Sequence, residues 1–153
     1  LAPLQGWANI DDLTPTGSGQ LRWFLMDIYR ATLYTPDGKY IEDGYPKALE
    51  IDYQRNIPAR RLVETTEKEW QRLKVDYDPN WLQQLEQLWP DIATGDKLTV
   101  RAADPNLAVF YFNGQRLGEI RSSNFAKAFL SIWLSPNSRD KTLRANLTGD
   151  NHG

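Results

Sequence analysis

The side chains that most often carry enzyme chemistry are nearly absent from this sequence. The 153-residue chain has no cysteine and a single histidine, His152, next to the last residue. A side chain that close to a chain end lacks the rigid support that a catalytic or metal-ligating group needs. Thiol chemistry, a Ser-His-Asp triad and ordinary zinc sites are therefore excluded unless a second chain contributes, and we expect no metal and no cofactor.

Three pairs of neighbouring carboxylates remain as candidates for acid–base chemistry: Asp11 with Asp12, Glu67 with Glu69, and Asp76 with Asp78. The first pair lies in a polar lead-in, the second on the expected solvent face of a helix, and the third in a turn before a helix. Carboxylates in such places are typically solvated or cap a helix end. Solvation is the favoured interpretation of all three pairs.

The best candidates for a binding site lie in residues 21–34. Polar side chains stand there among aromatic and β-branched ones: Arg22, Tyr29, Arg30, Thr32 and Tyr34. From this pattern alone, a half-exposed sheet face explains them without any ligand. The six Trp, seven Tyr and five Phe of the chain could, however, line an apolar cleft, and we expect any function to reside in one.

The β-strand signals fall into two groups, one within residues 21–54 and the other within residues 97–120. Residues 1–20 look like a turn-rich, ordered arm, with Gly17-Ser18-Gly19 interpreted as a turn because no helix follows it. A hairpin is expected over 21–34, and alternation predicts a strand over 47–54. Further strands are predicted over 97–103, 107–112 and 116–120, the last two joined by Asn113-Gly114, a strong hairpin signal.

Helical periodicity appears in four segments. An amphipathic helix follows Pro58 and runs to Leu73, and a second begins at Asp78-Pro79, a capping residue before a first-turn proline, and ends at Trp89. Residues 124–134 are apolar on nearly all sides, which predicts a helix buried at the centre of the fold. A short helix over 141–147 and a polar tail over 149–153 complete the chain.

The order of these elements predicts an α+β protein of one domain, residues 1–153. Strands, two helices, strands and a helix favour an antiparallel sheet with the helices on one face. The net charge of −2 and scattered basic residues argue against a nucleic-acid partner. No apolar run is long enough to span a membrane. Nothing in the sequence fixes an oligomeric state.

Three stretches, residues 17–34, 48–63 and 124–136, resemble the chalcone isomerase-like family and are most similar to its bacterial branch. The resemblance implies an open-faced β-sandwich, in which helices cover one large antiparallel sheet. Family members include enzymes that cyclise chalcones to flavanones and non-enzymatic proteins that bind fatty acids through an Arg and a Tyr. The implied cleft lies between residues 21–34 and the helices over 79–89 and 124–134.

The resemblance also assigns residues to this cleft. Tyr29 takes the position of the Tyr that contacts the fatty acid, and Leu21 takes that of the Arg, with Arg22 beside it. Trp81, Gln84 and Leu88 fall where the isomerases have a Tyr, a Lys and an Asn, and Ser131 falls where they have a substrate-contacting Thr. The residues expected to bind a ligand are Tyr29, Arg22, Arg30, Thr32, Ser131, Trp81, Leu85 and Phe129, with Trp23, Leu25 and Trp133 as further apolar lining.

Three functions follow as hypotheses. The first is a non-catalytic protein that binds a small apolar ligand, such as a fatty acid, with Tyr29 and Arg22 or Arg30 orienting its polar head. The second is an isomerase or lyase that uses Tyr29 to stabilise a developing oxyanion. The third is a structural or partner-binding protein whose cleft is filled by its own aromatic side chains. Because the bacterial relatives usually carry export signals and the chain begins at Leu1, we expect a periplasmic protein from which a signal peptide has been removed.

Overall fold

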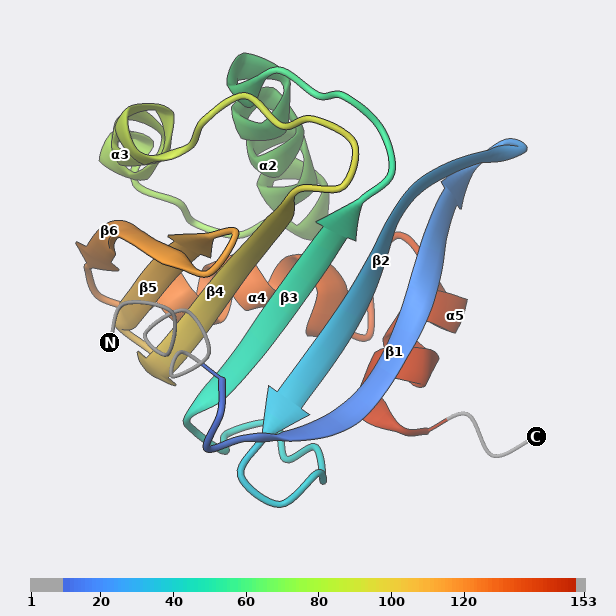
Figure 1. Ribbon diagram of the computed structural model, residues 1–153. Coiled ribbons are helices and arrows are strands. Elements are labelled where there is room, and N and C mark those ends of the chain that lie inside the picture. The colour runs from blue at the N-terminus through green and yellow to red at the C-terminus, as the bar shows by residue number, and fades with distance from the viewer. Residues whose placement is uncertain (1–9, 151–153) are drawn as a thin grey trace.

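The computed structural model describes residues 10–150, and these form one antiparallel sheet with helices on one side. The six strands lie in sequence order across the sheet (Figure 1). Their bounds are β1 Thr14–Trp23, β2 Met26–Thr35, β3 Lys47–Tyr53, β4 Lys97–Asp104, β5 Leu107–Phe112 and β6 Gln115–Arg121. Every neighbouring pair is antiparallel, so the predicted sheet is confirmed. Trp7 and His152 lie outside the described residues.

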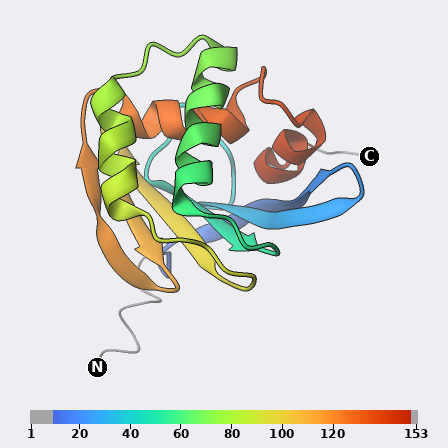
Figure 2. The ribbon, with the colours of Figure 1, turned by 90° about the horizontal axis from the view of Figure 1, so that it is seen from above.

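The helices cover a single face of the sheet, as Figure 2 shows from above. They are α2 Ala59–Leu73, α3 Pro79–Leu88, α4 Phe125–Leu134 and α5 Lys141–Thr148. Helix α4 packs on β4, β5 and β6, whereas α5 packs on β1 and β2. The α+β, open-faced arrangement expected from the sequence is therefore present.

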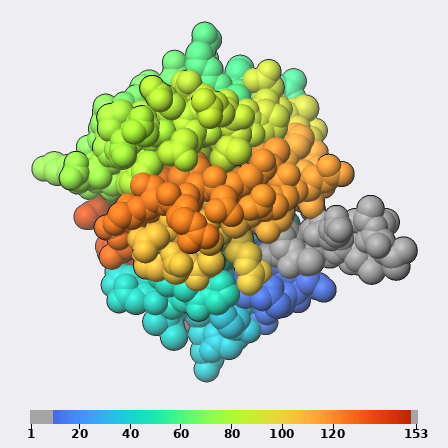
Figure 3. All heavy atoms as spheres, turned by 90° about the vertical axis from the view of Figure 1, so that its left-hand side faces the viewer, coloured from blue at the N-terminus to red at the C-terminus, as the bar shows by residue number. Residues whose placement is uncertain are grey.

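The start of α3 shows how local sequence sets these elements. The Asp78 carboxylate accepts a hydrogen bond of 2.9 Å from the backbone N–H of Asn80, and Pro79 occupies the first turn, where its missing N–H costs nothing. On the other side of the helix, Leu88 lies against Gly118 of β6, where an added Cβ would come within 2.6 Å of the leucine. Figure 3 shows α3 lying directly against β6 along this edge.

The prediction for the first strand was wrong. Gly17-Ser18-Gly19 is not a turn but the middle of β1, which begins at Thr14, and the hairpin turn is formed by Phe24 and Leu25. The glycines are there because α5 packs on this strand at backbone distance. A Cβ at Gly17 would lie 1.9 Å from the Asn146 carbonyl oxygen, and one at Gly19 would lie 2.8 Å from Leu143 Cδ1.

The core between sheet and helices is a continuous group of aromatic rings. Phe125, Phe129 and Trp133 follow one another along α4, with neighbouring ring centroids 5.9 and 5.2 Å apart. Phe110 of β5 meets Phe129 edge-on at 5.4 Å. Contacts of this kind bury large areas and favour one packing arrangement over others. The predicted central position of α4 is confirmed, since six of its ten residues are buried.

Two of the carboxylate pairs are not simply solvated. Glu69 is buried, with its side chain 9% exposed, and it accepts hydrogen bonds from Arg72 of its own helix and from Arg139 of the α4–α5 connection. Asp12 accepts two hydrogen bonds, 2.7 and 2.8 Å long, from Arg101 and so ties the segment before β1 to the uncovered face of the sheet. Both carboxylates hold the fold together.

Candidate functional site

Tyr29 lies where three strands and the helix layer meet. It is paired across the sheet with Leu21 of β1 and with Tyr53 of β3, and its side chain points toward the helices. The rings of Tyr29 and Tyr53 meet edge-on, with centroids 5.7 Å apart. Tyr53 is 5% exposed and Tyr29 is half-buried, so this pair of phenols marks the outer end of the core.

Helix α4 supplies a polar contact at this point. The indole N–H of Trp133 donates a hydrogen bond of 2.7 Å to the Tyr29 hydroxyl oxygen. A phenol can accept and donate at once, and the described residues offer no acceptor for the Tyr29 proton. The Tyr53 hydroxyl likewise has no hydrogen-bond partner among residues 10–150. The site therefore presents two phenol protons that are free to bind an oxygen atom.

Both phenols stay protonated at ordinary pH. Burial raises the pKa of the Tyr29 hydroxyl far above its usual value near 10, and the hydrogen bond from Trp133 offsets only part of this rise. The carboxylates of Asp140 and Glu69 raise the pKa of Tyr29 slightly further. Burial also raises the pKa of Tyr53. The site can thus donate hydrogen bonds, but it is poorly suited to holding a phenolate.

Inward from Tyr29, the expected cleft is occupied by the protein's own side chains. Trp81 is 4% exposed and donates a hydrogen bond of 2.9 Å to Ser122 Oγ, while Leu85 is fully buried and Phe129 is 3% exposed. These residues lie between the helices and the sheet, as expected, but they pack as part of the hydrophobic core and leave no open cleft there. One buried polar atom among them lacks a partner in the described chain, the indole N–H of Trp89, whose ring lies 5.8 Å from that of Phe129.

The other polar residues expected at the site are not gathered around Tyr29. Arg30 and Thr32 project from the opposite face of β2, where Arg30 donates a hydrogen bond of 3.0 Å to Ser18 Oγ. Arg22 is at the hairpin end in an ion pair of 2.7 Å with Asp27. Ser131 donates its hydroxyl proton to the Ala128 carbonyl oxygen of α4 itself. No arginine from the hairpin therefore shares a site with Tyr29.

Trp23 and Leu25, expected to line the cleft, are instead exposed, with 65% and 98% of their surface accessible. The strands β1 and β2 are longer than the sequence suggested, so their turn lies beyond the helix layer, where no helix can cover it. The expectation that these two side chains face a ligand cleft was wrong.

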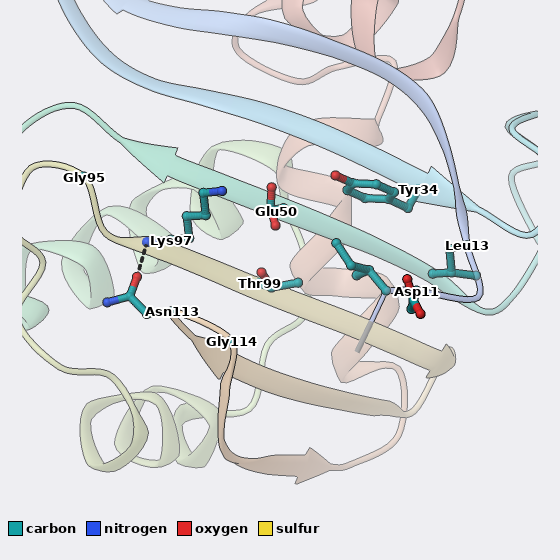
Figure 4. Close-up of a pocket in the computed structure, with 10 residues that line it drawn as sticks. Asp11, Leu13, Tyr34, Glu50, Gly95, Lys97, Thr99, Asn113 and Gly114 are labelled. Carbon is teal, nitrogen blue, oxygen red and sulfur yellow. Dashed lines mark hydrogen bonds between the residues drawn. The ribbon is translucent and has the colours of Figure 1, made fainter. Parts of the chain in front are cut away.

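A second concave surface lies on the opposite face of the sheet, which none of the described helices covers. Figure 4 shows Tyr34, Glu50, Thr99 and Lys97 standing on this face beside the segment that contains Asp11 and Leu13. The groove has a volume of about 610 Å³, and its lining mixes one cation, acids, hydroxyls and apolar carbon. Sequence reasoning gave no indication of it, because its residues come from five separate segments of the chain.

Residues 10–150 contain neither a metal-binding cluster nor a membrane-spanning helix. This part of the chain contains no cluster of three or more His, Asp or Glu side chains able to hold a metal ion. No helix in the same range is both long and apolar enough to cross a bilayer.

The chain is similar to known proteins over nearly its whole length. The family described as chalcone isomerase-like matches residues 7–149, nearly the whole chain. The chain belongs to this family. An uncharacterized protein of Haemophilus influenzae is 30% identical over 150 residues, which is 97% of this chain and 71% of that protein.

A solved structure places the family relationship in three dimensions. The crystal structure of a fatty-acid binding protein of Arabidopsis thaliana superposes with a TM-score of 0.72, covering 92% of this chain and 88% of the plant protein. The identity is 15%, so this likeness shows the chalcone isomerase-like fold only. Any ligand of the present chain has to be inferred from its own residues.

Sequence reasoning named Tyr29 as a candidate and did not name its neighbour Tyr53. Strand alternation had already put Tyr53 on the same face as Leu49 and Ile51, and that was the available signal. What the sequence could not show is the register, in which Tyr53 lies directly opposite Tyr29. The family resemblance named one phenol, and the sheet places the second beside it.

Proposed function

We propose that this protein is a non-catalytic binding protein for a small apolar molecule that carries an uncharged oxygen, held at Tyr29 and Tyr53. The observation that carries the proposal is the Tyr29 phenol, which accepts a hydrogen bond from Trp133 while its own proton has no acceptor among the described residues. Ligand sites generally combine an apolar lining with a few such polar groups.

The hydrogen bond from Trp133 strengthens Tyr29 as a donor. A phenol whose oxygen accepts a hydrogen bond is polarised, so its O–H donates more strongly to the next acceptor in the chain. Trp133, Tyr29 and a ligand oxygen would form such a chain, with Trp133 also fixing the direction of the phenol. The fold supplies the first two members in place.

The surrounding charge favours an uncharged head group. Leu21, an apolar residue, stands opposite Tyr29 at the position that the family resemblance aligns with the anion-binding Arg. The nearby carboxylates of Asp140 and Glu69 raise the pKa of the Tyr29 hydroxyl in addition to the larger effect of burial, and no hairpin arginine shares the site with Tyr29. An ionised carboxylate would be repelled there without a compensating cation. An alcohol, ester or protonated fatty acid would not.

The apolar part of the ligand requires space that the aromatic side chains now occupy. Ile132 and Trp133 in the last turn of α4 are half-buried, whereas Phe125 and Phe129 closer to its start are buried, so this last turn has the least packing to lose. A chain that displaced these side chains would run toward Phe129 and the unpaired N–H of Trp89. That buried donor is costly without an acceptor, and a second ligand oxygen would satisfy it.

Isothermal titration calorimetry with decan-1-ol and with decanoate at pH 7.5 tests the proposal. Decan-1-ol should bind more tightly than decanoate. Tyr29→Phe should weaken decan-1-ol binding by about threefold to tenfold, the range of one neutral hydrogen bond. Tyr34→Phe is the matched control, because Tyr34 is on the same strand but lines the groove on the opposite face. Equal binding by the wild type and Tyr29→Phe, with a loss in Tyr34→Phe, would place the ligand in that groove and refute the proposal.

A structural protein with a filled cleft is the second candidate, and the packing of Trp81 favours it. Trp81 contacts Trp70 and Phe125 edge-on and its N–H is satisfied by Ser122, so this part of the cleft behaves as an ordinary core. On this hypothesis neither compound raises the midpoint of thermal unfolding at concentrations up to its solubility limit. Trp133→Ala would then destabilise the protein and open no binding site.

A further inference from the structure

The turn between β1 and β2 carries four consecutive large apolar residues that no other part of residues 10–150 covers. The exposed fractions are 65% for Trp23, 83% for Phe24, 98% for Leu25 and 43% for Met26. Trp23 and Phe24 stack on each other with centroids 5.9 Å apart. Single exposed apolar residues are common on protein surfaces, but a contiguous group of this size marks an interaction site. We refer to residues 23–26 as the apolar tip.

The backbone of the apolar tip is unfavourable for the residues that form it. Phe24 has a φ of +57°, a conformation that bulky side chains rarely adopt. A two-residue hairpin turn with positive φ at its first position ordinarily has Gly there. A turn selected only to connect two strands would not keep Phe at this position. Strain of this kind is typical of functional surfaces, so the ring is held outward for contact with something else.

The shape and charge around the apolar tip indicate what it contacts. The hairpin extends beyond the helices and the rest of the sheet, so the tip is convex (Figure 1). Behind it are the exposed arginines Arg22, Arg30 and Arg55, and across the strands Arg22 is paired with Asp27 and Arg30 with Asp52. Arg55 approaches Met26 Sδ at 3.2 Å, and Arg22 pairs with Asp27. These five groups together carry a net charge of +1, whereas the whole chain carries −2.

We propose that the apolar tip inserts into the interface of a lipid bilayer containing anionic lipids. A convex group of Trp, Phe, Leu and Met fits a deformable apolar medium, and Trp is enriched at the level of the lipid headgroups. Arginines set behind the tip lie where anionic headgroups would be, which supplies the charge complementarity. The proposed ligand site follows on the same strand, since Tyr29 is three residues, or about 10 Å, beyond Met26. Transfer of an apolar ligand from bilayer to Tyr29 would rest on the proposed function; insertion itself does not.

Sedimentation with vesicles of phosphatidylglycerol and phosphatidylcholine tests the insertion. The double variant Phe24→Asn with Leu25→Ser removes the most exposed part of the tip, and Asn tolerates the positive φ at position 24, so folding is preserved. The partition coefficient of this variant should fall at least tenfold. Ile41→Ser is the matched control, because Ile41 is 64% exposed in the β2–β3 connection at the other end of the strands, and it should bind as the wild type does.

The charge contribution is tested by Arg22→Gln with Arg55→Gln, which should weaken binding to these vesicles and leave any binding to pure phosphatidylcholine unchanged. Absence of wild-type binding, or equal binding by wild type and the tip variant, would overturn the proposal. So would a concentration-dependent dimer, seen by analytical ultracentrifugation, that the tip variant abolishes. Tyr29→Phe should bind vesicles normally and the tip variant should bind dissolved decan-1-ol normally, so the two proposals fail separately.

Discussion

Replacing Gly17 by Ala should destabilise the protein more than any other single methyl group added to a glycine of the sheet. The new Cβ would lie 1.9 Å from the Asn146 carbonyl oxygen and 2.9 Å from that of Leu147. Both obstacles are backbone atoms of α5, so no side-chain rotation can relieve the clash. The helix or the strand must move by about 1.5 Å before the contact reaches an ordinary van der Waals distance.

The free energy involved follows from what α5 buries. Overpacking by one methyl group usually costs about 1 to 3 kcal/mol. Here the displaced helix also carries Leu143 and Leu147, 4% and 0% exposed, whose full burial contributes roughly 1.5 to 3 kcal/mol each. Because alanine has less conformational freedom than glycine in the unfolded chain, the substitution also stabilises the variant by about 0.4 to 1 kcal/mol. We expect a net loss of about 2 to 4 kcal/mol.

Urea unfolding followed by circular dichroism measures this loss, with two alanine variants as references. Gly19→Ala should cost less than Gly17→Ala, because its Cβ meets the flexible end of Leu143 at 2.8 Å. Gly95→Ala meets nothing within 4 Å and should cost only the strain of its positive φ, about 1 kcal/mol. If Gly17→Ala is no less stable than Gly95→Ala, the close packing of α5 on β1 is not as described.

Three further results are expected. Burial alone would raise the pKa of Glu69, but the hydrogen bonds from Arg139 and Arg72 outweigh burial and lower the pKa. The stability that this carboxylate contributes is therefore complete above pH 4.5 and is lost as the pH falls through the lower pKa of the folded state. Glu69→Gln should flatten the acid limb of a curve of unfolding free energy against pH. Asp78→Ala, which removes the cap of α3, should cost about 0.5 to 2 kcal/mol in urea unfolding. Periplasmic export stays a prediction, checked by fractionating cells that express the natural full-length protein.

Much of the fold could be predicted because local signals and burial agree. Asp78-Pro79 gave the start of α3, Asn113-Gly114 gave the turn between β5 and β6, and the apolar residues of α4 gave its central position. In each case the information lies within a few residues of the feature. Chain-local patterns of this kind survive into the folded state when tertiary packing reinforces them.

The wrong predictions concern residue types that are compatible with two different structural environments. Gly17 and Gly19 could equally permit a turn or a close approach of a helix, and only the position of α5 distinguishes the two. Glu69 follows the pattern of a solvated helix face, yet it is buried and pairs with Arg139, seventy residues away. Trp23 and Leu25 were expected in a cleft because large apolar residues usually lie inside. No local pattern reports that a hairpin extends beyond its covering helices.

The placement of the two helices on the sheet explains why Tyr29 and Tyr53 are at the margin of the core. Helix α4 packs on β4 to β6 and α5 on β1 and β2, so β3 and the adjoining side of β2 lie beneath the junction of the two helices. The segment that joins them is held by Glu69 through Arg139 and by the hydrogen bond of 3.0 Å from Arg72 to the Asn137 carbonyl oxygen. A junction closed by polar contacts opens at less cost than a packed helix face, because water can replace those contacts. On the proposed function, a ligand would reach the phenols at this α4–α5 connection, and the core behind α3 would remain closed.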